Sequence, residues 1–86
     1  MFSRMPTLLD VNGFQVRVLL PPREHGPPHV HVVKSGAVVV INLPVGAQPL
    51  SIRTVSHMKN ADVVAAFRIV EEHTKTLLAA WRRYHD

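Results

Sequence analysis

Three histidines and two prolines crowd into one short stretch of this 86-residue chain. Residues 24–31 have the sequence EHGPPHVH and hold three of the six histidines. A proline ring fixes φ at about −65° and disfavours the helical region for the residue before it, so Pro27 and Pro28 predict a stiff turn that enters a strand. Because side chains alternate along a strand, we expect His29 and His31 on the same face. This stretch is the candidate functional site.

Acid–base chemistry on RNA is one function for such a site. Histidine changes its protonation near neutral pH and serves both as a general base and as a general acid. In a metal-independent ribonuclease, His29 and His31 would take these two roles and Glu24 would orient one ring. Arg17 or Arg23 would bind the phosphate through paired hydrogen bonds. If the chain is an enzyme, this is the reaction that we expect.

A metal site is the first alternative. His25, His29 and His31 would be the ligands of zinc or a similar divalent ion, with Glu24 as a fourth. The chain has no cysteine, so imidazole and carboxylate are the ligands that it offers.

The second alternative is structural. His25 would cap the turn and one of the other two rings would bond a main-chain carbonyl, which leaves the surface as a non-catalytic interaction module. The sequence leaves all three readings open.

Composition narrows the class of protein. Lys and Arg exceed Asp and Glu by ten to six, which gives a net charge of +4 and favours an anionic partner such as RNA or an acidic protein. A hydrophobic fraction of 47% is typical of a folded chain, and we expect one domain over residues 1–86. A domain of this size is marginally stable, so a homo-oligomer or a permanent partner is expected.

No stretch is apolar enough for a signal peptide or a membrane span, and the absence of cysteine suits the cytoplasm.

Two hairpins are expected in the first half. Residues 7–11 and 14–20 flank Asn12 and Gly13, a strong signal for a tight hairpin turn, with Arg17 on the face opposite the apolar residues. Residues 29–33 and 37–43 form the second hairpin around a turn at 34–36. The valine-rich residues 37–41 predict a central strand that is buried on both faces. Residues 50–53 predict a short edge strand or an extended connector.

The last third predicts one helix. Asn60 is a suitable N-cap, and apolar residues recur at helical spacing after it: Val63, Phe67, Val70, Leu77 and Trp81. The fold class is therefore α+β, a twisted antiparallel sheet of four or five strands with one C-terminal helix packed across one face. We expect Arg17 to lie close to the histidines.

Three motifs resemble a family of small bacterial proteins of unknown function. They are Met5-Pro6-Thr7, the EHGPPHVH core at 24–31, and Leu77-Leu78 followed by Trp81. The family pattern has Asp where this chain has Glu24, which keeps the charge but extends the side chain. The resemblance implies one half of a two-gene cassette similar to toxin–antitoxin modules, with a small protein from the neighbouring gene as partner. We therefore expect a cytoplasmic component of such a pair that binds its protein partner, and RNA, through residues 25–31.

Overall fold

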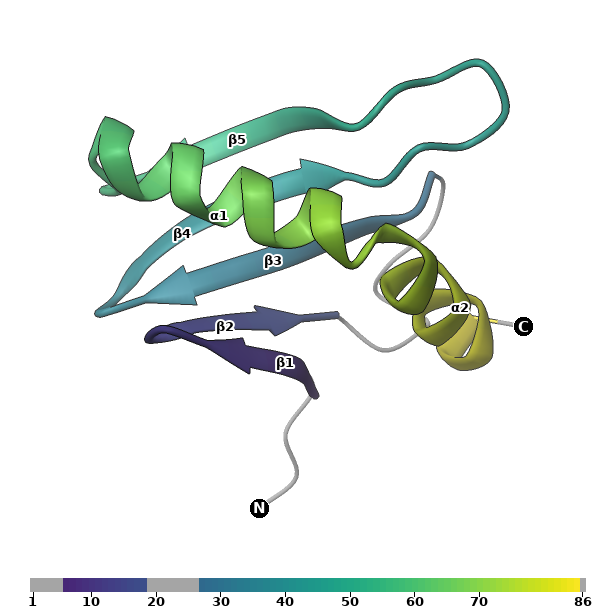
Figure 1. Ribbon diagram of the computed structural model, residues 1–86, viewed down its shortest axis with the longest axis horizontal. Helices are drawn as coiled ribbons and strands as arrows, with labels where there is room; N and C mark the ends of the chain where they lie inside the picture. Colours follow the sequence, from purple (N-terminus) through teal and green to yellow (C-terminus); the bar gives the residue numbers. More distant parts are fainter. Residues whose placement is uncertain (1–5, 19–26, 86) are drawn as a thin grey trace.

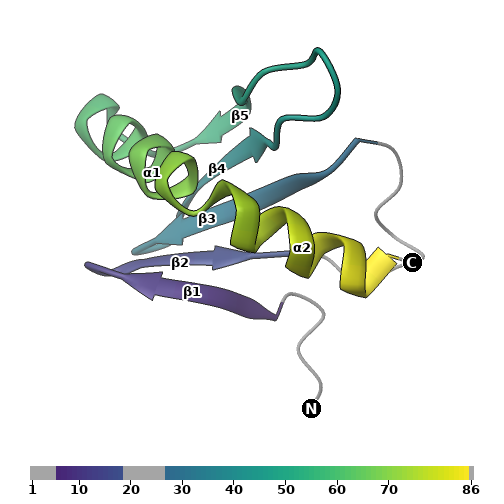
Figure 2. The ribbon, with the colours of Figure 1, turned by 45° about the vertical axis from the view of Figure 1, so that its right-hand side comes forward.

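One antiparallel sheet and two helices make up the structure. The computed structural model describes residues 6–18 and 27–85. The strands are β1 (Thr7–Val11), β2 (Phe14–Arg17), β3 (His29–Lys34), β4 (Ala37–Asn42) and β5 (Ser51–Ser56), and the helices are α1 (Asn60–Glu72) and α2 (Thr74–His85). The strands pair in chain order, β1-β2-β3-β4-β5, with both helices on the same side of the sheet (Figures 1 and 2). The predicted α+β class is confirmed, and the sheet has the fifth strand.

Two tight turns fix the register of the sheet. Asn12 and Gly13 have φ values of 50° and 83°, and Ser35 and Gly36 have 48° and 81°. Positive φ at both central residues is the type I′ turn, whose twist matches that of the strands that it joins. Both predicted hairpins are therefore present, and the turn of the second is two residues long.

The two faces of the sheet differ in burial. Val30 and Val32 of β3 and Val39 and Ile41 of β4 are completely buried beneath the helices. On the opposite face Val38 and Val40 are only half-buried, which corrects the expectation that this strand is buried on both sides. The reason is that α1 and α2 lie on one side only (Figure 2). The central strand is β3, not β4.

The helical third is divided at His73, where a single helix was expected. His73 has φ −117° and ψ 19°, and its ring Nδ1–H donates to the Ile69 carbonyl over 2.8 Å. The Thr74 hydroxyl donates to the Val70 carbonyl over 3.0 Å. In a continuous helix the backbone N–H groups of the next turn would bond these two carbonyls. Here the His73 and Thr74 side chains bond them instead, so α1 ends and the chain changes direction.

Contacts at each end attach the helical layer to the sheet. At one end Lys34 reaches from β3 to Asp62 in the first turn of α1 over 3.2 Å, with its ammonium 4.6 Å from the ring centroid of Phe14. At the other end Leu77 of α2 is completely buried and belongs to the same core as the strand valines. The predicted apolar stripe therefore does pack on the sheet.

Removing the buried Leu77 side chain should loosen the attachment of α2. We expect Leu77→Ala to lower the free energy of unfolding by about 2–5 kcal/mol, because it leaves a cavity in a closed core. The neighbouring Thr76→Ala, at an exposed position, is the control and should change it by less than about 0.5 kcal/mol. Urea unfolding followed by circular dichroism measures both. Equal effects of the two substitutions would contradict the packing of α2.

Candidate functional site

The predicted site is described only in part. Arg23, Glu24 and His25 lie outside the described residues, so their predicted roles are untested. His29 and His31 begin β3, and Arg17 ends β2. These three residues lie on two neighbouring strands of the sheet.

His29 is the more deeply buried of the two histidines. Its side chain is 2% exposed, and its Nδ1 lies 3.0 Å from the carbonyl oxygen of Pro27. A carbonyl only accepts hydrogen bonds, so Nδ1 carries a proton and donates it to Pro27. The next carbonyl, of Pro28, accepts from the Leu43 backbone over 2.9 Å. The diproline segment thus orients the His29 ring and is itself held against the end of β4.

His31 is half-buried on the same face as His29, as the strand alternation predicts. The two ring centroids are 5.5 Å apart, with the ring planes tilted by 58°. In the register of the sheet His31 lies between Arg17 on β2 and Val40 on β4. Antiparallel pairing puts such partners about 4.5–5.5 Å apart at the backbone, so the predicted approach of Arg17 to the histidines is present.

The Arg17 side chain is held by a hydrogen bond to a residue of its own strand. Its guanidinium donates to the side-chain oxygen of Gln15, two residues earlier on the same face. Its Nε is buried and has no hydrogen-bond partner among the described residues. The residue as a whole is half-buried, and a carboxylate or phosphate is the best match for a guanidinium.

The sequence did not indicate a second arginine beside this site. Arg53 of β5 donates from Nε to Oδ1 of Asn42 over 2.7 Å, and Asn42 donates to the Ser51 hydroxyl over 3.2 Å. The register shifts between Val40 and Ile41, a bulge that places Arg53 beside the β4 side chains of the histidine face. Alternation alone does not predict a bulge, so Arg53 was identified only as part of an edge strand.

Together these residues form what we call the open face, the side of the sheet opposite the helices. Among the described residues its polar members include Asp10, Gln15, Arg17, His29, His31, Asn42, Ser51, Arg53, Thr54 and Ser56, and its apolar members include Val33, Val38 and Val40. Val33 lies on β3 and Val38 and Val40 lie on β4, beside the polar side chains of the same two strands. A surface that combines apolar area with polar groups is typical of protein interfaces.

The described residues do not contain a complete metal site. Within residues 6–18 and 27–85 no three His, Cys, Asp or Glu side chains come together to hold an ion. The metal alternative therefore requires His25 or Glu24 in addition to His29 and His31. Neither described helix is long and apolar enough to cross a membrane.

The fold and this face define a small α+β domain with a five-stranded antiparallel sheet that helices cover on one side. A family model, described as a domain of unknown function (DUF4160), matches residues 13–82. The chain belongs to this DUF4160 family. Searches among curated proteins and among solved structures found no significant match.

The two histidines should differ sharply in their effect on stability. His29→Ala removes a buried ring and its bond to Pro27, and we expect it to lower the free energy of unfolding by about 1–3 kcal/mol. His31→Ala, at a half-buried position, should cost less than about 1 kcal/mol. Denaturant titration of both variants tests this difference. A larger loss for His31→Ala would contradict the assignment of His29 as the ring that supports the strand entry.

Proposed function

We propose that this chain is the partner-binding component of a two-gene, toxin–antitoxin-like pair, and that it binds an acidic surface of its protein partner through the open face. The observation that supports this most is the composition of that face. Half-buried Val33, Val38 and Val40 lie between Arg17 and Arg53, so the surface offers apolar contact area and cationic groups together.

The charge distribution agrees with an acidic partner. The chain carries a net charge of +4, and among the described residues of the open face two arginines, Arg17 and Arg53, outnumber the one carboxylate, Asp10. Each guanidinium already has one side-chain hydrogen bond, to Gln15 and to Asn42 respectively. These bonds restrict the arginine side chains before binding, which lowers the entropy lost when a carboxylate docks.

A binding role explains the face better than cleavage of RNA. A nuclease would need both imidazoles in contact with the substrate, whereas His29 is 2% exposed and bonded to Pro27. The half-buried valines add nothing to phosphate recognition but contribute strongly to a protein interface. His31 is then a contact residue at the centre of the face, next to Arg17.

Binding to the product of the adjacent reading frame tests the proposal. We expect the two proteins to co-purify, and Arg53→Glu to weaken the complex at least about tenfold, because it puts like charges together at the interface. Arg17→Ala tests a second position of the same face. Arg82→Glu is the matched control, since Arg82 is exposed on α2, in the helical layer, and it should leave the affinity unchanged. Isothermal titration calorimetry gives all four affinities.

Two results would overturn this proposal. One is the absence of a complex with the neighbouring protein, and the other is equal affinity of the Arg53→Glu and Arg82→Glu variants. Binding of a single-stranded RNA with a steep salt dependence and no binding of the protein would make RNA the partner of the same face.

A metal-binding function is the second candidate, and the geometry of His29 favours it. A histidine that donates Nδ1–H to a carbonyl is oriented to bind an ion through Nε2, and this is the common arrangement of metal ligands. Zn–N bonds of about 2.0–2.1 Å in a tetrahedral site put two imidazole centroids about 5 Å apart, close to the 5.5 Å between His29 and His31. His25, with Glu24, would complete the ligand set.

Elemental analysis of protein purified without a histidine tag tests this candidate. We expect about one zinc per chain, and its loss in His31→Ala, which removes a ligand without removing the buried ring. Thr54→Ala, which changes another side chain of the same face, should retain the ion. Metal-free protein after purification in zinc-containing buffer would exclude the candidate.

A further inference from the structure

The helical layer is too narrow to cover the whole sheet. Strands lie about 4.8 Å apart and a helix is about 10 Å wide, so one helix covers about two strands. α1 packs on β4, and the edge strand β5 lies next to β4 at the side of the sheet (Figure 1). Ile52 is 45% exposed and Val55 47% exposed, although both pair with completely buried residues of β4. Side chains that belong to the core side are therefore uncovered along one edge.

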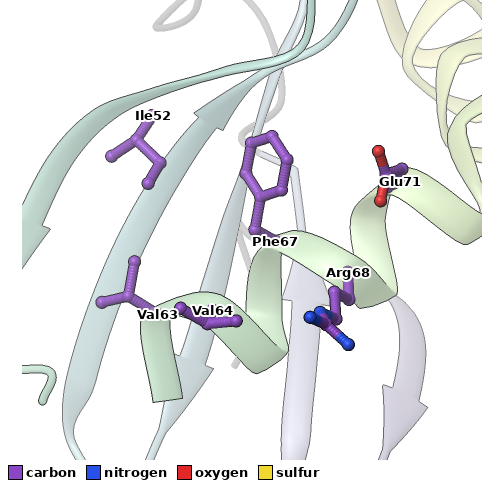
Figure 3. A pocket seen from close by; sticks show the side chains of 6 residues that line it. All are labelled: Ile52, Val63, Val64, Phe67, Arg68 and Glu71. Atoms are coloured by element: carbon purple, nitrogen blue, oxygen red, sulfur yellow. The ribbon is translucent and has the colours of Figure 1, made fainter. Parts of the chain in front are cut away.

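A groove lies between this strand and the first helix. Ile52 of β5 and Val63, Val64 and Phe67 of α1 line it, and Figure 3 shows these four side chains around the same space. Its volume is about 330 Å³, and Val64 on its rim is 53% exposed. We call this the α1 groove. It is mainly apolar and one side of it is formed by a helix, so a second helix is the element that would fill it.

Extension of the sheet is the less suitable way to cover this edge. β5 carries a bulge at Arg53, and a bulge and a charged side chain on an edge strand both hinder pairing with another strand. The apolar surface faces the helical layer, next to α1. A partner that covers this apolar surface would therefore lie beside α1, in the same layer as the helices.

The charges beside the groove indicate which neighbour. Arg68 and Glu71, also on α1, lie at the groove three residues apart, and both are exposed. Among the described residues neither forms an ion pair. Their charges cancel, so this surface, unlike the open face, does not attract an acidic partner. When two identical helices run antiparallel across a two-fold axis, opposite charges about one turn apart meet their opposites: the arginine of each copy faces the glutamate of the other.

We propose that a second copy of this chain docks in the α1 groove, with the two α1 helices antiparallel and Arg68 of each copy paired with Glu71 of the other. Val64 of one copy then covers apolar surface of its partner near Ile52. The interface is isologous, as in most dimers, because the same residues act on both sides. The homodimer uses the helical layer and leaves the open face free for the partner of the proposed function, on which this inference does not depend.

A charge exchange tests the pairing directly. Sedimentation equilibrium of the full chain should show a dimer, and Arg68→Glu and Glu71→Arg should each weaken it at least about tenfold, because each puts two like charges together in both halves of the interface. The double variant Arg68→Glu/Glu71→Arg restores opposite charges and should return the dissociation constant to within about threefold of the original. Thermal unfolding of each variant shows whether the protomer remains folded.

Val64→Glu provides a second, independent test. It should convert the dimer to a folded monomer, whereas Val45→Glu, at another exposed valine outside the groove, should leave the dimer intact. A monomer at all concentrations of the unmodified chain would overturn the inference. A dimer that resists Val64→Glu, or single charge variants that the double variant does not rescue, would overturn it as well.

Discussion

The alternation of side chains along β3 determines the rest of this structure. Val30 and Val32 must be buried beneath the helices, because they form the centre of the only core that a chain of this length can build. Because side chains alternate along the strand, His29 and His31 must then lie on the opposite side of the sheet. A shift of one residue in the hairpin would place the imidazoles beneath the helices and the valines on the opposite face, so the Ser35-Gly36 turn that sets the register also sets the position of the site.

Much of this arrangement follows from local rules. The Asn12-Gly13 turn, the second hairpin and the apolar stripe that includes Leu77 were all predictable, since each depends on residues close in sequence. The pairing of Arg17 with His31 on neighbouring strands also follows once the positions of both hairpin turns are known. What made these features predictable is that turn chemistry and side-chain alternation agree along β2, β3 and β4.

The remaining features depend on contacts that a sequence pattern does not contain. The bulge that carries Arg53 to Asn42 arises from the pairing of β4 with β5, and no residue type marks it. Asn60 looked like an N-cap, but it is the first residue of α1 and Lys59 occupies the cap position without a side-chain hydrogen bond. The open side of β4 was expected to be buried because Val38 and Val40 are apolar, whereas burial depends on how many helices the chain has to cover it. Arg23, Glu24 and His25 lie outside the described residues, so the predicted contribution of the first half of the motif stays a prediction.

The break at His73 divides the helical layer into two units that need not open together. α1 is joined to the sheet by the Lys34–Asp62 ion pair and by its buried Ala66, Ile69 and Val70, whereas α2 has Leu77 as its one completely buried side chain among the described residues. The His73 N–H donates to the Val70 carbonyl, three residues back, and the Leu77 N–H donates to the His73 carbonyl across Thr74, so the regular helical ladder is interrupted at His73. This irregularity is a point at which fraying of the last helix can stop. Of the two described helices, α2 is therefore the one whose amides should exchange with solvent sooner, while the sheet beneath α1 stays closed.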